Sequence, residues 1–91
     1  MIRVVLAGEL PALARELRDR GVEVVYTGPA SPEHVAATAL QEDPDAVVAA
    51  EQADEVAALL ARLDAADVPV IAPDDALTWV DTAGDRTHHP R

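Results

Sequence analysis

Four short runs rich in valine and alanine divide the sequence, and the segments between them are long enough for crossover connections. The runs cover residues 2–7, 23–26, 46–49 and 68–72. In the intervening segments, apolar residues recur at helical spacing and charged residues occupy the opposite side. Strands that alternate with helices in this way pair in parallel, because each helix carries the chain back across the sheet. The pattern predicts an α/β fold with a doubly wound parallel sheet of four strands.

Residues at the expected helix ends support this division. Pro11 suits the first turn of the first helix, and Gly21 suits the cap at its C-terminus. Ser31 and Pro32 together form a strong helix start, with the serine hydroxyl as N-cap and the proline in the first turn. These signals place the first two helices directly after the first two strands.

Large aliphatic residues on the helices define the expected core. Most of the apolar residues are Ala and Val and the chain has no Phe, so the core must come from close packing of the helices on the sheet. We expect Leu17, Leu40 and Leu60 to be buried there. The last helix is expected to be short, which gives one domain over residues 1–81 and a flexible tail over residues 82–91.

The composition excludes several classes of function. The formal net charge is −10, with no Lys and no Cys. An acidic surface repels phosphates, so we expect neither nucleic acid nor an anionic membrane as a partner. Without cysteine there is no disulfide framework, thiolate nucleophile or cysteine metal site. The apolar run at the N-terminus is too short for a signal peptide or a membrane span, which predicts a cytoplasmic protein.

The central part of the chain resembles the cobalamin-binding domain of methylmalonyl-CoA mutases. The resemblance is carried by residues 13–45, LARELRDRGVEVVYTGPASPEHVAATALQEDPD. Its matching features are the helix end RELRDRG, the strand EVVYTG, the helix start SPEHV and the segment ALQEDPDAVV. The resemblance implies a flavodoxin-like (Rossmann-like) sheet with strand order 2-1-3-4, and here the fifth strand of the family is missing or rudimentary.

Three cofactor-contacting segments of that family are replaced in this sequence. The family carries Asp-x-His-x-x-Gly after the first strand, and its His is the lower ligand of cobalt; residues 8–11 here read GELP. A Ser-x-Leu turn after the third strand corresponds to residues 49–51, AAE. The Gly-Gly pair after the fourth strand corresponds to residues 72–74, APD. The chain therefore looks like a degenerate and truncated relative that keeps the fold and lacks the means to hold cobalt.

Ligands in this fold lie outside the carboxyl ends of the strands, at the switch between strands one and three. We expect Gly8, Glu9 and Glu51 to lie around this crevice. The two carboxylates would face the phosphate of a cobalamin tail, which is unfavourable. Thr27 and Gly28 are the positions to which the resemblance would assign a tail pocket if cobalamin were bound.

We predict no catalytic residues and no metal site. His34 stands at a helix start, where an exposed structural role accounts for it. The pair His88 and His89 lacks the carboxylate or cysteine support of a zinc site. Asp74 and Asp75 are expected to cap the last helix. A phosphoacceptor function like that of response-regulator receivers is excluded because the chain has no lysine.

These observations lead to one main functional hypothesis and two alternatives. The main hypothesis is a non-catalytic accessory or protein-interaction module, which pairs with itself or with a mutase-related protein. The first alternative is a genuine cobalamin-binding protein without a protein histidine ligand. The second is a small-molecule sensor that uses the shortened crevice. We expect no enzyme activity of the chain alone and no cofactor, with cobalamin as the alternative. An open edge at the fourth strand favours a dimer there or over the last helix.

Overall fold

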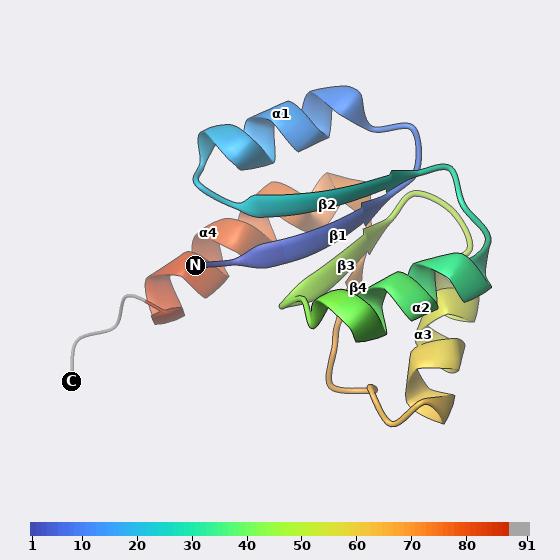
Figure 1. The fold of residues 1–91 in the computed structure, drawn as a ribbon. Helices are drawn as coiled ribbons and strands as arrows, with labels where there is room; N and C mark the ends of the chain where they lie inside the picture. Colours follow the sequence, from blue (N-terminus) through green and yellow to red (C-terminus); the bar gives the residue numbers. More distant parts are fainter. Residues whose placement is uncertain (88–91) are drawn as a thin grey trace.

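A computed structural model describes residues 1–87 of the chain, with the side chains of residues 1–83. The strands are β1 (Arg3–Ala7), β2 (Glu23–Gly28), β3 (Ala46–Ala49) and β4 (Val70–Ile71). The helices are α1 (Pro11–Asp19), α2 (Pro32–Glu42), α3 (Ala53–Arg62), the single 3₁₀ turn η1 (Pro73–Asp75) and α4 (Ala76–Thr87). All strand pairs are parallel and their order is β2-β1-β3-β4 (Figure 1). The predicted α/β fold and strand order are confirmed, and within residues 1–87 no fifth strand follows β4.

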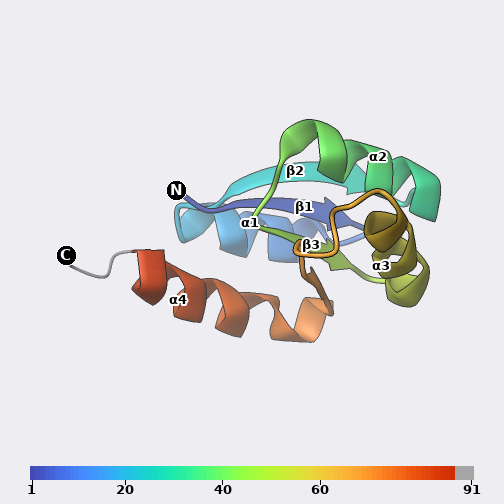
Figure 2. The same ribbon diagram turned by 90° about the horizontal axis from the view of Figure 1, so that it is seen from below.

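The sheet is the middle of three layers. Helices α1 and α4 cover one face, and α2 and α3 cover the other (Figure 2). Successive residues of β1 point to opposite faces, so Val4 packs towards α1 and α4 while Val5 packs towards α2 and α3. Both central strands are almost wholly buried for this reason.

The expected helix ends of α1 and α2 are confirmed. Pro11 is the first residue of α1, and Gly21 follows its C-terminus with a φ of +84°. At α2, the Ser31 hydroxyl accepts a hydrogen bond of 3.1 Å from the backbone N–H of His34. These local contacts satisfy backbone groups that a helix end leaves without partners.

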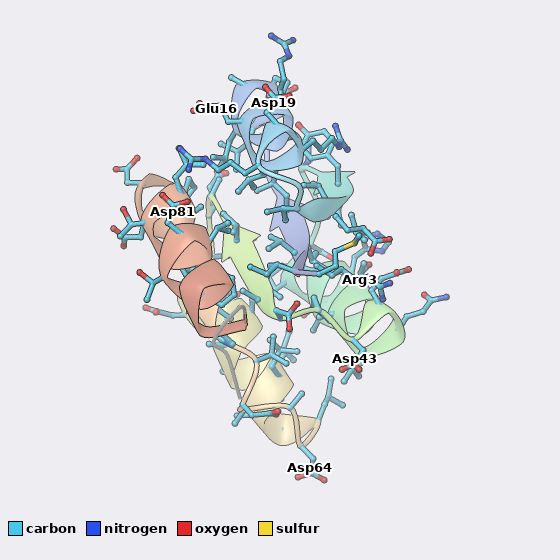
Figure 3. The ribbon with its side chains drawn as sticks, turned by 90° about the vertical axis from the view of Figure 1, so that its left-hand side faces the viewer. Arg3, Glu16, Asp19, Asp43, Asp64 and Asp81 are labelled. Atoms are coloured by element: carbon cyan, nitrogen blue, oxygen red, sulfur yellow. The ribbon has the colours of Figure 1, made fainter. Side chains whose placement is uncertain are left out.

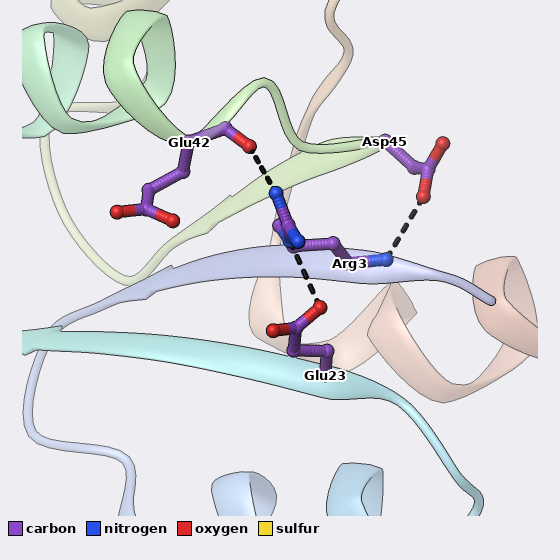
Figure 4. Close-up of polar contacts among 4 residues, drawn as sticks. All are labelled: Arg3, Glu23, Glu42 and Asp45. Carbon is purple, nitrogen blue, oxygen red and sulfur yellow. Dashed lines mark hydrogen bonds and ion pairs between the residues drawn. The ribbon is translucent and has the colours of Figure 1, made fainter.

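Arg3 ties together three elements at the amino edge of the sheet (Figure 4). Its Nε donates to Oε1 of Glu23 at 2.9 Å, and its Nη1 donates to the carbonyl oxygen of Glu42 at 2.7 Å. The backbone N–H of Arg3 donates to Oδ2 of Asp45 at 2.8 Å. The hydrogen bond and the negative charge of Glu23 raise the pKa of Arg3, because both favour the charged guanidinium. Strands β1 and β2 and the end of α2 are therefore joined by a group that stays charged at every physiological pH.

The acidic side chains lie on the surface. Figure 3 shows them pointing away from the core on α1 and α4 and beyond the ends of α2 and α3, at Glu16, Asp19, Asp43, Asp64 and Asp81. Within the side chains that the structure describes, no charged or polar residue is buried. Asp81 accepts a hydrogen bond of 2.7 Å from Nη1 of Arg20, which joins α4 to the end of α1. None of the helices in residues 1–87 has the length and apolar character to cross a membrane.

The prediction that Leu40 is buried is wrong, whereas Leu17 and Leu60 are buried as expected. The buried stripe of α2 runs through Val35, Ala36 and Ala39. Leu40 follows Ala39 by one position, about 100° around the helix, and keeps 46% of its surface exposed. The side of α2 that faces the sheet is thus made by Val35, Ala36 and Ala39, and Leu40 lies outside that stripe.

Part of the segment expected as a flexible tail over residues 82–91 belongs to a helix. Helix α4 continues to Thr87, so residues 82–87 are helical. The reason is an apolar stripe in which Ala76, Val80 and Ala83 pack against the sheet on successive turns. The remainder of the expected tail, with His88 and His89, lies outside the described residues.

Two predictions about the segment around β4 are also corrected. The expected strand over residues 68–72 shortens to Val70–Ile71, because Pro69 has no N–H and the N–H of Val68 bonds instead to the carbonyl of Ala65. The expected side-chain cap from Asp74 or Asp75 is replaced by turn η1, which leads directly into α4 and begins without a side-chain cap bond. Strand β4 is thus a short edge strand.

Truncating Leu17 to Ala should lower the free energy of unfolding by about 2–5 kcal/mol, because its fully buried side chain would leave a cavity between α1 and the sheet. This is a large part of the roughly 5–15 kcal/mol that a domain of this size has. The matched control is Leu40→Ala, which should cost about 1 kcal/mol or less because the side chain is half exposed. Urea unfolding followed by circular dichroism measures both, and equal losses would contradict the packing described here.

Candidate functional site

Three loops meet at the carboxyl edge of the sheet. The N–H of Gly8 after β1 donates to the carbonyl of Gly28 at 2.9 Å, and the N–H of Ala50 after β3 donates to the carbonyl of Ala7 at 3.0 Å. A cavity of about 450 Å³ lies between these loops and the first turns of α2 and α3. Its apolar lining is made by Ala7, Pro29, Ala30, Pro32, Val35, Ala50 and Val56. The cavity occupies the predicted switch point between β1 and β3.

The structure brings the predicted crevice residues together. Gly8, Glu9 and Glu51 all line the cavity, and both glutamate side chains are exposed at its rim. Gln52 also lines it and was not predicted from the sequence. It is the N-cap of α3, has a left-handed φ of +58° and makes no side-chain cap bond. The only feature of the sequence that could have indicated this role for Gln52 is its position directly after Glu51.

Thr27 and Gly28 do not line this cavity, and both hold the end of β2 in place. The pairing of β2 with β1 shifts there, so that Ala7 lies opposite Gly28 and Thr27 is passed over. The hydroxyl of Thr27 donates to the carbonyl of Gly28 at 2.8 Å. Gly28 has a φ of +68°, and its carbonyl accepts the bond from Gly8. Both residues therefore have a structural role at the end of β2.

Gly8 and Ala50 close the gap between β1 and β3. Gly8 has a φ of +128°, and a Cβ atom added to it would lie 2.6 Å from the Cβ of Ala50. Only glycine combines that backbone conformation with that close approach. The two loops thus touch directly, and the open space lies to one side of them, towards α2 and α3.

Other residues considered from the sequence lie away from the cavity or serve packing. His34 is exposed in the first turn of α2. The Tyr26 hydroxyl accepts a hydrogen bond of 3.0 Å from the N–H of Leu10, which fixes the loop after β1. Trp79 is half buried against the core on the side of α1 and α4. Among the residues that the structure describes, no three His, Cys, Asp or Glu side chains form a group able to hold a metal ion.

The cavity combines an apolar lining with a small number of polar groups. Its lining offers apolar surface, the amide of Gln52 and two carboxylates, and none of its lining residues is an arginine or a histidine. Comparison with known families finds no family that matches the chain, and comparison with curated proteins finds no matching sequence. The chain is thus a flavodoxin-like α/β domain with an acidic, apolar-floored cavity at its switch point, and its function must be argued from these residues.

Replacing Gly8 with Ala should destabilise the domain by about 1–3 kcal/mol or more, because strain at a positive φ adds to the contact with Ala50. In the double variant Gly8→Ala, Ala50→Gly, the stability lost through the contact with the Ala50 side chain should return, whereas the stability lost through strain at the positive φ should not. Gly21→Ala is the control, since Gly21 also has a positive φ but nothing lies within 4 Å of its added Cβ. The midpoints of urea unfolding measure the stability of each variant. If Gly8→Ala is no less stable than Gly21→Ala, the close approach of position 8 to Ala50 is contradicted.

Proposed function

We propose that this chain is a non-catalytic accessory module, which keeps the fold of a mutase cobalamin-binding domain and uses it to contact another protein. The partner is a second copy or a mutase-related protein in the cytoplasm. The observation that carries the proposal is the direct contact of Gly8 with Ala50. In the family that the sequence resembles, the loop after the first strand supplies the histidine that ligates cobalt. In this chain the same loop closes onto its neighbour.

The short loop after β1 supplies no ligand for cobalt. Residues 8–10 separate β1 from α1, and the N–H of Leu10 bonds to the carbonyl of Gly8 at 3.1 Å and to the Tyr26 hydroxyl at 3.0 Å. The loop contains no nitrogen side chain. The carboxylates of Glu9 and Glu51 stand at the rim, where a cobalamin phosphate would have to be desolvated beside them. These features favour a module that does not carry cobalamin.

Titration of the purified protein with hydroxocobalamin and adenosylcobalamin tests this part of the proposal. We expect no change in the cobalamin absorbance spectrum at micromolar concentrations, because the loop after β1 contains no nitrogen side chain that could ligate cobalt. Circular dichroism on the same sample must report a folded α/β protein. Micromolar binding with a histidine-on-cobalt spectrum that is lost in His34→Ala would overturn the proposal. Binding without that spectrum would support the alternative of a cobalamin carrier without a protein ligand.

We propose that two copies of the chain associate through the sheet edge formed by β4. Val70 and Ile71 are only half buried there, and Trp79 of α4 is half buried as well. An edge strand presents backbone groups on its outer side, and charges or proline usually protect it. Pro69 protects only the start of β4, so Ile71 remains beside an open edge.

Replacing Ile71 with Lys should therefore weaken a dimer by placing a charge at its interface. Sedimentation equilibrium of the wild-type protein should show a monomer–dimer equilibrium, and Ile71→Lys should shift it towards monomer. Leu63→Lys is the matched control, since it adds the same charge in place of an exposed aliphatic residue at the end of α3. A wild-type protein that stays monomeric at high concentration, or a dimer disrupted by Leu63→Lys alone, would refute the assignment of this edge.

A further inference from the structure

The cavity at the switch point is large enough for a small organic molecule. Its volume of about 450 Å³ lies in the range of ligand pockets, roughly 300–1,000 Å³. Its walls come from the loops after β1, β2 and β3 and from Pro32, Val35 and Val56 on α2 and α3. Side chains of alanine, proline and valine leave an apolar floor that a hydrocarbon group would cover.

The rim carries negative charge that no cation among the side chains described in the structure pairs with. Glu9 and Glu51 contribute one carboxylate each from different loops, and among the described residues neither makes an ion pair. The first turn of α3 adds Asp54 and Glu55 beside the rim. This field repels anionic ligands and attracts cations.

We propose that this cavity binds a small organic cation, an aliphatic amine whose hydrocarbon part lies on the apolar floor while its ammonium group contacts Glu9 and Glu51. The amide oxygen of Gln52 supplies a third acceptor at the same rim. A bare metal ion fits less well, because it would leave the apolar floor uncovered and needs more converging oxygen ligands than two carboxylates on separate loops supply. The inference goes beyond the protein-contact function and does not depend on it, and it gives a chemical class to the alternative of a small-molecule sensor.

Three probes of equal chain length separate the contributions of charge and apolar surface. Hexylammonium, hexanol and hexanoate are titrated into the ¹⁵N-labelled full-length protein at low salt, and amide shifts are followed by NMR. Hexylammonium should shift the resonances of Gly8, Glu9, Ala50 and Glu51 and bind at millimolar concentration or better. Hexanol should bind more weakly and hexanoate not at all. Added salt should weaken the binding of hexylammonium, because the rim charges are exposed and screened.

Two kinds of variant test the geometry. Glu9→Gln and Glu51→Gln should each weaken hexylammonium binding by up to about fivefold, the range expected for exposed ion pairs. Asp19→Asn is the control, because it removes the same charge at the far end of α1 and should leave the affinity unchanged (Figure 3). Ala30→Leu should fill the cavity and abolish binding in a protein whose circular dichroism stays native.

The proposal is overturned if hexylammonium and hexanoate shift the same resonances equally. It is also overturned if both Glu→Gln changes together leave the affinity for hexylammonium unchanged, or if Mg²⁺ alone reproduces the shifts at these four amides. Absence of any hexylammonium binding at millimolar concentration refutes it as well. None of these outcomes changes the cobalamin titration, so failure of this inference and failure of the accessory-module proposal can be told apart.

Discussion

Strands β1 and β3 are buried on both faces, and the positions of all the helices follow from that constraint. Val4, Val5 and Leu6 have no exposed surface, and Val47 and Val48 have almost none. A parallel pair with two apolar faces is stable only when helices cover both of them. Because the core is made mainly of alanine and valine, those helices must lie close to the sheet, and α4 packs beside α1 on the same face through Ala76, Val80 and Ala83.

The same close packing determines the shape of the carboxyl edge. Central strands with small side chains bring the loops after β1 and β3 so close that position 8 must be glycine. The bonds from Gly8 to Gly28 and from Ala50 to Ala7 then lock the three loops together. The open space is displaced towards α2 and α3, so a ligand at this switch point would rest between two helix starts and not between the two central strands.

The central strands could be predicted from the sequence, because a strand buried on both faces reads as an unbroken apolar run. The edge strands could not be bounded in the same way. The end of β2 depends on a register shift opposite Ala7, and the length of β4 depends on Pro69 and on a turn bond from Val68 to Ala65. Glu9 and Glu51 could be placed at the crevice because they follow central strands. The apolar floor could not be predicted, because helical periodicity marks Val35 and Val56 simply as core residues and does not show that they line a cavity.

The two edges of the sheet use charge in opposite ways. At the amino edge, the guanidinium of Arg3 donates to the Glu23 carboxylate and to the carbonyl oxygen of Glu42, so its charge is used in contacts within the fold. At the carboxyl edge, Glu9 and Glu51 stand beside an apolar cavity with no arginine in its lining. An acidic surface spread evenly over a protein serves solubility alone. Carboxylates beside an apolar cavity act differently. They attract the ammonium group of a bound amine, while the hydrocarbon part of the same amine is removed from water by the apolar floor. The two edges therefore differ: the guanidinium of Arg3 is used within the fold, whereas Glu9 and Glu51 stand beside an apolar cavity and make no ion pair with the residues that the structure describes.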